Sequence, residues 1–359
     1  MGALRTATRS LGLARQILGT HATGTRPFKI TWMLTERCDC RCEACFIWKR
    51  EKGAEVTPEA LGQVLATVPS LRWVNLTGGE PFLRSDMPEL AEAVLRALPQ
   101  LMVLDFPTTG QRTEAILAGC AEIARLGIPR LFVSVSLDGP PELHARLRGR
   151  PDAFDNAMRT YAALREMPGV RPYLGLTISD QNAHLIEDTL RAVQGRVPGV
   201  TWRDIHLNVF TESAHYYGNE ASAVGAPVDL EEALREPLRA REGSWDPADA
   251  IEATYLRLLP QYLRTGRSPL PCRSLTAGLF VDARGDVYPC TVWDRKLGNV
   301  FETPLPEILA SAQAEKTRQA IARDACPGCW SPCEAHPTIV SMAPKSLLRG
   351  TSAAGRGRA

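Results

Sequence analysis

Charge of either sign is nearly balanced in this sequence. Its 359 residues carry 42 Lys and Arg against 40 Asp and Glu, which gives a formal net charge of +2. Nucleic-acid-binding domains carry a clear basic excess. No nucleic-acid partner is therefore expected.

Long apolar runs and internal repeats are also missing. Residues 1–20, MGALRTATRSLGLARQILGT, are basic and amphipathic. They lack the continuous apolar stretch of a signal peptide or a membrane span. We expect residues 1–27 to form an N-terminal segment that packs on the domain. The alternative is a weak contact of residues 1–20 with an anionic membrane surface.

Cysteine is too scarce for a disulfide scaffold, because only ten cysteines occur in the whole chain. Four of them lie in TERCDCRCEAC, residues 35–45. Cysteines two positions apart on an extended chain are poorly placed to bridge each other. Free thiols of this kind predict a reducing, cytoplasmic location and a metal-binding loop.

This loop permits more than one metal site. Cys38, Cys42 and Cys45 form C-x3-C-x2-C and leave Cys40 over, whereas Cys42 and Cys45 alone form a redox pair or half of a zinc site. Residues 28–34 read as a buried strand that places the loop at its carboxyl end, where barrel and open α/β folds keep their chemistry. Three thiolates on an iron–sulfur cube leave one iron open for a ligand. A zinc knuckle remains the alternative at this point.

A second motif follows the next predicted strand, residues 72–77. Gly78-Gly79-Glu80-Pro81 comes directly after it. Two glycines allow a sharp turn and a close approach of the backbone to a ligand. Alone, this is an ordinary turn; after the cysteine loop, it becomes a specific signal.

Together the two motifs resemble the radical S-adenosylmethionine (radical SAM) superfamily. The resemblance implies that Cys38, Cys42 and Cys45 bind a [4Fe–4S] cluster whose open iron binds SAM. It also implies that Gly78, Gly79 and Glu80 line the methionyl part of SAM. Cys40 has no counterpart, and Ala44 stands where the family usually has an aromatic residue, with Phe46 and Trp48 just after it.

The rest of the chain predicts an α/β fold. Amphipathic helical stretches such as residues 87–98 separate six strand-like runs. Repeated β/α units of this kind imply a parallel sheet, and six of them suit the partial (β/α)6 TIM-type barrel of the family. The runs are residues 28–34, 72–77, 101–106, 131–137, 173–178 and 205–210. We assign the core barrel to residues 28–210 and a loop and helical linker to residues 211–270.

Polar residues near the ends of the later strands are candidates for SAM contacts. By resemblance these are Ser136, Asp138, Arg148 and Thr177, although Asp-Gly-Pro after the fourth strand is also a plain turn signal. Residues 211–228 lack periodicity and read as a long loop at the strand ends. In this loop His215, Tyr216 and Tyr217 are candidates for substrate contact, with simple packing as the alternative.

A second group of cysteines begins at Cys272. The spacing Cys272-x12-Gly285-x4-Cys290, with a hairpin tip at Arg284-Gly285, precedes Cys326-x2-Cys329-x3-Cys333. A four-cysteine zinc ribbon is one interpretation. The pattern also resembles the SPASM/twitch extension of radical SAM enzymes, which we assign to residues 271–340.

The resemblance implies one auxiliary [4Fe–4S] cluster, because the full SPASM pattern needs more cysteines. We expect Cys272, Cys290, Cys326 and Cys329 to bind it, while Cys333 either replaces one of them or stays free as a catalytic thiol. The sulfatase-maturating branch has a catalytic Asp directly after the cysteine that corresponds to Cys290. Here Thr291 stands in that place, with Asp294 nearby as a weaker catalytic candidate.

These features predict a radical SAM oxidoreductase or rearrangement enzyme. SAM would be cleaved to a 5′-deoxyadenosyl radical that takes hydrogen from a small molecule such as a sugar, cyclitol or lipid headgroup. The auxiliary cluster would accept an electron or bind the substrate, and a flavodoxin or ferredoxin would supply electrons. The alternatives are a peptide-modifying maturase of the same superfamily and, from another class, a zinc-binding interaction protein. The basic tail, residues 341–359, is predicted to be disordered.

Overall fold

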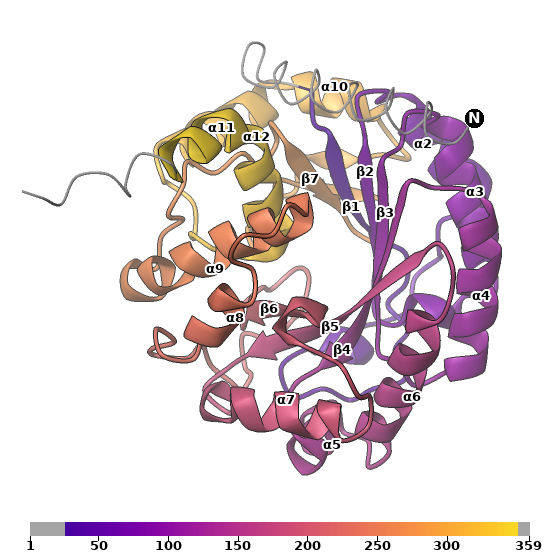
Figure 1. The fold of residues 1–359 in the computed structure, drawn as a ribbon. Coiled ribbons are helices and arrows are strands. Elements are labelled where there is room, and N and C mark those ends of the chain that lie inside the picture. The colour runs from indigo at the N-terminus through magenta and orange to yellow at the C-terminus, as the bar shows by residue number, and fades with distance from the viewer. Residues whose placement is uncertain (1–25, 351–359) are drawn as a thin grey trace, which may run out of the picture.

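The structure is a computed structural model that describes residues 26–350, so the predicted N-terminal segment lies almost wholly outside the described residues. Six parallel strands form a partial barrel in the order β6-β5-β4-β3-β2-β1 (Figure 1). A strand occurs at each of the six predicted positions, and the predicted fold is confirmed. The strands are β1 (Lys29–Met33), β2 (Trp73–Thr77), β3 (Val103–Thr108), β4 (Arg130–Leu137), β5 (Val170–Ile178) and β6 (Ile205–Val209).

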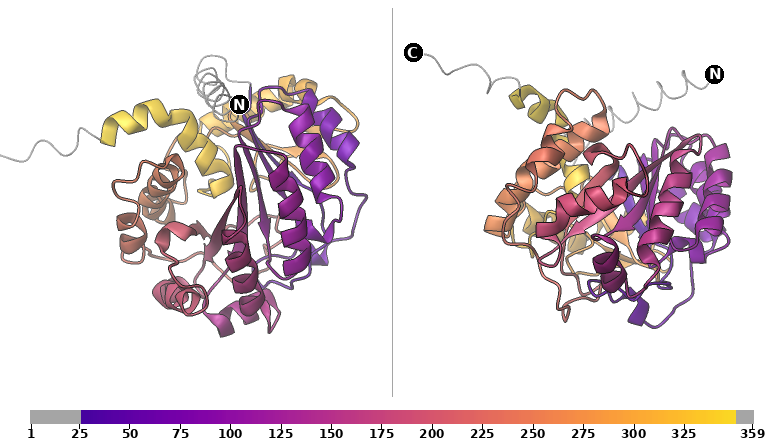
Figure 2. Two further views of the ribbon diagram at one scale, coloured as in Figure 1. Left: turned by 45° about the vertical axis from the view of Figure 1, so that its right-hand side comes forward. Right: turned by 60° about the horizontal axis from the view of Figure 1, so that its bottom comes forward.

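Helices follow the strands and cover the outer face of the sheet (Figures 1 and 2). They are α2 (Pro58–Ala66), α3 (Met87–Ala97), α4 (Thr113–Arg125), α5 (Pro141–Arg148), α6 (Ala153–Arg165) and α7 (Ile186–Gln194). Local signals fix their ends. Thr57 caps α2, its hydroxyl accepting from Ala60 N at 3.2 Å, and Gly149 ends α5 with φ +65°.

Side chains along the strands alternate between an outer face that packs against helices and an inner face that lines a cavity. On β2, Val74 and Leu76 are fully buried in the core with Leu61 and Leu90 of the covering helices. Trp73, Asn75 and Thr77 of the same strand line an internal cavity. Successive strand residues point to opposite faces, so the inner wall of the barrel is free to carry polar groups.

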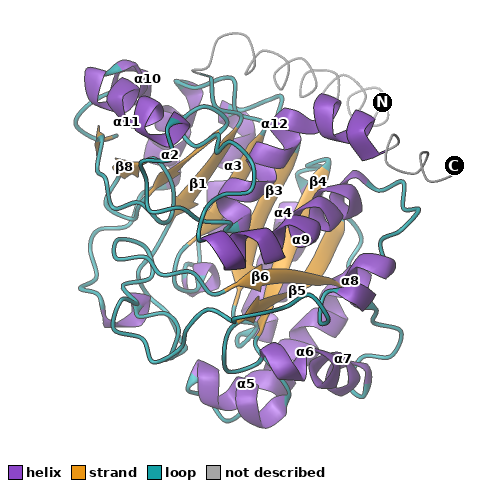
Figure 3. Cartoon of the chain, turned by 90° about the vertical axis from the view of Figure 1, so that its left-hand side faces the viewer, coloured by secondary structure: helices purple, strands orange, loops and turns teal. Residues whose placement is uncertain are grey.

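Two helices from the second half of the chain lie over the open side of the barrel (Figure 3). These are α9 (Pro247–Thr265) and α12 (Pro332–Gly350), and α8 (Arg235–Arg239) precedes them. Asp246 caps α9 by accepting from Ala248 N at 2.9 Å. Because α12 continues to Gly350, the predicted disordered tail is wrong for residues 341–350.

The C-terminal extension adds to the barrel sheet, which the sequence did not reveal. β7 (Gly278–Val281) pairs in parallel with β1 and antiparallel with β8 (Asp286–Tyr288), so the predicted hairpin is present. The remaining elements are β9 (Gly298–Asn299), α10 (Leu305–Ala310) and α11 (Ala312–Ala322), with 3-10 turns at Ile47–Lys49, Pro81–Leu83, Ala183–Leu185 and Trp202–Asp204. In the described part of the chain, none of the helices has the length and apolar character needed to cross a membrane.

Candidate active site

The cysteine loop after β1 is joined to the end of β2 by backbone hydrogen bonds. Leu34 N donates to Thr77 O at 2.7 Å, and Gly79 N donates to Thr35 O at 2.9 Å. Glu80 N donates to Arg37 O at 2.8 Å. The loop and the glycine turn are therefore one rigid unit at the carboxyl end of the sheet.

Both glycines of the turn are required by close contacts. A Cβ on Gly78 would lie 2.5 Å from Thr35 O, and one on Gly79 would lie 2.1 Å from Arg37 O. Neither distance is tolerable for a side chain. The glycines thus let the two backbones meet, and both line the cavity.

Glu80 points away from that cavity. Its side chain is fully buried, and its carboxylate accepts from Thr108 Oγ1 and Phe82 N, each at 3.0 Å, and from Thr109 N. Burial raises the pKa of Glu80 to about 7. The carboxylate ties the end of β3 to the turn, and Glu80 N and O are also hydrogen-bonded within the protein, so Glu80 does not line the cavity in which its contact with SAM was predicted.

The end of α5 holds the loop from the other side. Arg41 N donates to Arg148 O and Glu43 N to Leu147 O, both at 2.9 Å. Gly149 is also needed here, because a Cβ on it would lie 2.8 Å from Arg41 O. The loop after β1 and the helix α5 after β4 therefore meet around one cavity.

That space is a cavity of about 1310 Å³ inside the barrel. Most of the residues predicted to bind the cluster and SAM line it together. They are Cys38, Cys42, Cys45, Gly78, Gly79, Ser136, Asp138, Arg148 and Thr177.

The three thiols sit in an environment that suits a metal more than free thiolates. Burial raises the pKa of Cys38 and of Cys45 to about 12. A hydrogen bond from Cys40 and the nearby Arg148 lower the pKa of Cys42 to about 7. Metal binding deprotonates buried thiols of this kind, and all ten cysteines are free of disulfides. The donor set therefore fits a cluster held by three thiolates.

Arg148 connects the thiols to the fourth strand end. Its Nη1 lies 3.8 Å from Cys42 Sγ, and its Nε lies 2.5 Å from Asp138 Oδ2. Asp138 N also donates to His144 Nδ1 at 3.0 Å. The charge of Asp138 is thus already compensated, so any contact with SAM would use its remaining lone pairs.

The long loop after β6, residues 211–228, packs against the cysteine loop. Asn219 Nδ2 donates to Ala44 O at 3.0 Å, and Phe46 N donates to Tyr217 O at 2.8 Å. Tyr216 and Tyr217 line the cavity, but His215 does not; it stacks on Tyr288 at 4.3 Å and contacts Cys290 O. Trp48 also lines the cavity, as does Ala44, the position at which the family usually has an aromatic residue.

Four of the C-terminal cysteines form a separate group outside the cavity lining, in which Cys290 and Cys329 are buried and Cys272 and Cys326 are half-buried. Burial raises the pKa of Cys290 and Cys329 well above the ordinary value, and each is raised further by Glu334 and by Cys272. Cys326 lies near Cys272, whose pKa it helps to raise. The four residues predicted for the auxiliary cluster are therefore neighbours in space.

Cys333 differs from these four because it lines the barrel cavity. Its carbonyl accepts from Lys29 Nζ at 2.9 Å, which joins the start of α12 to β1. Burial raises the pKa of its thiol to about 11. Of the two predicted roles for Cys333, the placement favours a free cavity thiol.

The two positions compared with the sulfatase-maturating branch take no part in the cavity. Asp294 is exposed and lies outside the cavity lining, so its candidate catalytic role is not supported. Thr291 is buried and donates through its N and Oγ1 to Glu334 Oε1, at 3.0 and 3.2 Å. Thr291 therefore joins the segment after β8 to the start of α12.

The inner wall adds polar residues that the sequence analysis did not select. Lys29, Trp73 and Asp105 lie in strands and line the cavity, with Lys29 Nζ 4.7 Å from the Trp73 ring centre. Asp105 accepts from Trp73 Nε1 and from Asn75 Nδ2. One signal in the sequence could have found them: Lys29 and Asp105 are charged residues inside predicted strands, and buried strands are usually apolar.

Comparison with known families agrees with this geometry. The profile described as "Radical SAM superfamily" matches residues 32–193, and the SPASM profile, an iron–sulfur cluster-binding domain, matches residues 272–331. Cys333 lies just beyond the second match.

The chain is also similar to several curated proteins and solved structures. The chain is 27% identical to an AdoMet-dependent heme synthase of Nitratidesulfovibrio vulgaris, over 86% of this chain and 84% of that protein. It is 23% identical to the antilisterial bacteriocin subtilosin biosynthesis protein AlbA of Bacillus subtilis, over 84% and 65%. The structure of Streptococcus suis SuiB bound to S-adenosylmethionine superimposes with a TM-score of 0.59 at 17% identity, over 82% and 68%.

Proposed function

The chain belongs to the radical SAM superfamily and carries a C-terminal SPASM domain, and on that basis we propose that it removes a hydrogen atom from a small molecule held in the barrel cavity. SAM and iron–sulfur clusters are the cofactors of these two domains. When bound, a cluster held by Cys38, Cys42 and Cys45 would supply the electron for the reductive cleavage of SAM, and a cluster in the extension would be a second redox centre.

One observation carries the proposal: a single cavity is lined by Cys38, Cys42 and Cys45 and also by Cys333 from the C-terminal extension. Pockets for drug-sized ligands measure about 300–1,000 Å³, so about 1310 Å³ leaves room for a small substrate beside SAM. Aromatic and polar groups share the inner wall, including Trp73, Tyr173 and Asp105. This mixture suits a polar, ring-shaped molecule such as a sugar, a cyclitol or a lipid headgroup.

The residues of the chain would divide the work as follows. Cys38, Cys42 and Cys45 hold the cluster, and Gly78, Gly79, Ser136 and Thr177 position SAM. Helices α9 and α12 close the open side, which limits water near a reactive radical. Cys333 keeps its proton, since burial raises the pKa of its thiol to about 11.

A protonated thiol at this wall can return a hydrogen atom to a substrate carbon radical. The S–H bond breaks, a C–H bond forms, and the thiyl radical left on Cys333 is restored by one electron, supplied by a donor of the flavodoxin or ferredoxin type, and one proton from solvent. A Cys333→Ala variant tests this in D2O, where the exchanged thiol carries deuterium. The wild-type product should contain one deuterium at the reacting carbon, and the variant should form none of that product; an unchanged product would remove Cys333 from the chemistry.

Peptide modification is a second candidate, favoured by the similarity to the bacteriocin biosynthesis protein AlbA and to SuiB, which is also solved bound to the precursor peptide SuiA. The relatives also include heme synthases, so tetrapyrroles must be tested too. The reconstituted, reduced enzyme should be mixed with SAM and with one substrate class at a time, and 5′-deoxyadenosine measured by mass spectrometry. The proposal expects sugars, cyclitols or headgroups to raise its formation at least about tenfold over the uncoupled rate, an effect of about 1.4 kcal/mol. Stimulation by peptides or tetrapyrroles alone would contradict it.

A further inference from the structure

Three side chains of metal-binding type meet in the cavity without any cysteine. They are His206 on β6, Glu252 on α9 and His336 on α12, and all three line the cavity. Their positions in the sequence are far apart, so no spacing motif points to them. The fold brings them together because α9 and α12 both close the barrel beside β6 (Figure 3).

The ligand atoms have the separations of a mononuclear site. His206 Nδ1 lies 2.8 Å and His336 Nε2 lies 3.6 Å from Glu252 Oε2. All three ligand atoms lie within 4.8 Å of one another. Metal bonds to imidazole and carboxylate are about 2.0–2.2 Å long, which puts neighbouring ligand atoms about 3–3.6 Å apart. One ion therefore fits with little movement of the side chains.

A role in stabilising the fold alone explains His206 and Glu252 but not His336. The contact of His206 with Glu252 is a good hydrogen bond that ties α9 to β6. His336 Nε2 lies 3.6 Å from Glu252 Oε2, an ion-pair separation that is longer than a normal hydrogen bond. Within residues 26–350, this buried nitrogen has no hydrogen-bond partner. Buried polar atoms are nearly always satisfied, and the long contact with Glu252 leaves His336 Nε2 able to take a closer ligand.

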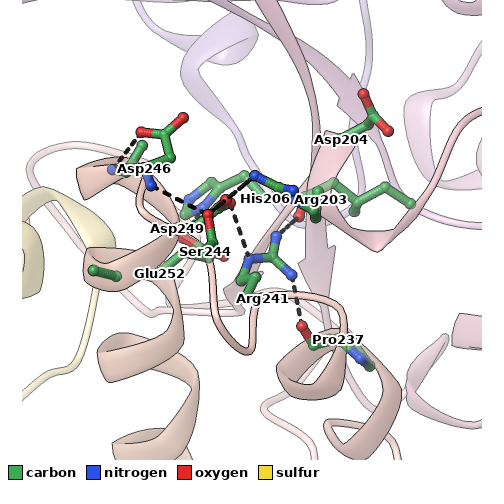
Figure 4. A network of polar contacts seen from close by, with 12 residues as sticks. Arg203, Asp204, His206, Pro237, Arg241, Ser244, Asp246, Asp249 and Glu252 are labelled. Carbon is green, nitrogen blue, oxygen red and sulfur yellow. Dashed lines mark hydrogen bonds and ion pairs between the residues drawn. The ribbon is translucent and has the colours of Figure 1, made fainter.

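Surrounding contacts fix the carboxylate for such a ligand. Leu207 N donates to Glu252 Oε1 at 3.1 Å, which leaves Oε2 directed at the two imidazoles. One turn earlier on α9, Asp249 accepts from Arg203 and from Ser244 Oγ, and Arg241 Nη2 donates to Ile205 O at 2.7 Å (Figure 4). This network anchors the start of α9 to the start of β6. Supporting shells of this kind orient metal ligands.

Aromatic packing fixes the two imidazoles as well. The Tyr255 ring lies 6.3 Å from the His206 ring and 5.5 Å from the His336 ring, centre to centre. Trp330 stacks on Tyr255 and donates from Nε1 to Tyr255 O at 3.0 Å. The rings are therefore held in place by the SPASM-domain end of the chain.

We propose that His206, Glu252 and His336 bind one divalent transition-metal ion, of the Zn²⁺ or Fe²⁺ type, whose open positions face the barrel cavity. Two imidazoles and one carboxylate are a ligand set for zinc and for non-haem iron, and three protein ligands leave coordination positions for exchangeable groups. An oxygen atom of the substrate takes one of these positions. The ion is thus a third metal centre, distinct from both cysteine groups, which orients the substrate through a hydroxyl or carboxylate group.

The test uses the anaerobic holoenzyme with both cysteine groups loaded and Zn²⁺ as the probe. After incubation and desalting, zinc and iron are counted by mass spectrometry. The wild type should keep one zinc per chain, whereas Glu252→Gln and His336→Gln should lower zinc affinity at least about tenfold with unchanged iron. His184→Gln removes an exposed histidine outside the cavity and should keep the zinc. Equal zinc in the wild type and both site variants, or none in the wild type, would overturn the proposal.

Zinc X-ray absorption separates this site from zinc bound to cysteines. The proposal expects nitrogen and oxygen neighbours at about 2.0–2.2 Å, and sulfur neighbours at about 2.3 Å would contradict it. Circular dichroism of each variant shows whether the fold is retained. Should Gln at position 252 unfold the chain, His336→Gln alone decides, because it leaves the His206–Glu252 contact in place. These readouts do not depend on SAM cleavage or on the identity of the substrate.

Discussion

The two cysteine groups of this chain are held in different ways. The first lies on a loop that backbone hydrogen bonds fix to β2 and α5, and its three thiols open onto the cavity. Of the second group, Cys272, Cys290, Cys326 and Cys329 do not line that cavity, and burial raises the pKa of Cys290 and Cys329 well above the ordinary value. A metal that must bind SAM needs an open position, whereas one that only exchanges electrons can be enclosed. The difference in access to the cavity therefore matches a difference in task.

The largest effect is expected when one cysteine of the first group is replaced. Cys42→Ala should remove about four of about eight irons and reduce 5′-deoxyadenosine formation to background, because the SAM-binding cluster needs all three thiolates. Cys40→Ala is the matched control, since Cys40 is fully buried and does not line the cavity. Loss of SAM cleavage in the control as well would mean that Cys40 is a ligand. Iron content and mass spectrometry of the products give both answers.

Replacing one cysteine of the second group should lower the iron content but leave SAM cleavage in place. Cys290→Ala is expected to lose about four irons, while uncoupled 5′-deoxyadenosine formation stays within about threefold of the wild type. Cys120 on α4 is also buried and lies outside both groups, so Cys120→Ala should leave the iron count unchanged. Equal loss of SAM cleavage in Cys290→Ala and Cys42→Ala would show that the two groups do not act separately.

A smaller effect is expected at the glycine turn. In Gly79→Ala the new Cβ would lie 2.1 Å from Arg37 O, so the turn and the cysteine loop must move apart. We expect the free energy of unfolding to fall by about 2–3 kcal/mol and the Kd for SAM to rise at least about tenfold. Gly62→Ala in α2 is the control, because its Cβ would meet Ala93 at an ordinary 3.6 Å. Denaturant titration and SAM binding would contradict the account if the two variants behaved alike.

The smallest effect concerns Thr291. Thr291→Val removes the hydroxyl that donates to buried Glu334, and it should lower the free energy of unfolding by about 1–2 kcal/mol. 5′-Deoxyadenosine formation should remain within about twofold, because Thr291 does not line the cavity. Thr303→Val, at a half-buried loop position outside the cavity lining, offers a control of the same chemistry. A large loss of activity with normal stability would instead mean that Thr291 acts in the reaction.

Sequence reasoning reached the barrel because its signals are local. Alternating strands, helical periodicity and the turn Gly78-Gly79 each follow from a few neighbouring residues. The cysteine loop was accessible for the same reason, whereas the candidate SAM-contacting residues came from the family resemblance and stay predictions. The resemblance to a family then joined these local signals into one site.

The features that were missed depend on contacts between distant segments. The pairing of β7 with β1, the position of Cys333 on the cavity wall and the meeting of His206 with His336 all require the closed barrel. Glu80 shows a second limit of sequence motifs: its motif predicts a binding turn, but the sequence does not show that its carboxylate is hydrogen-bonded to Thr108. The predicted tail failed at residues 341–350 because composition indicates disorder, whereas α12 continues to Gly350.

The most direct test of two separate cysteine groups is an iron and sulfide count with an EPR spectrum of the reduced protein, recorded with and without SAM. The account predicts about eight irons in two cubic clusters, with SAM perturbing only the signal that Cys42→Ala abolishes. A count of about four irons, or a signal that SAM does not perturb, would contradict it.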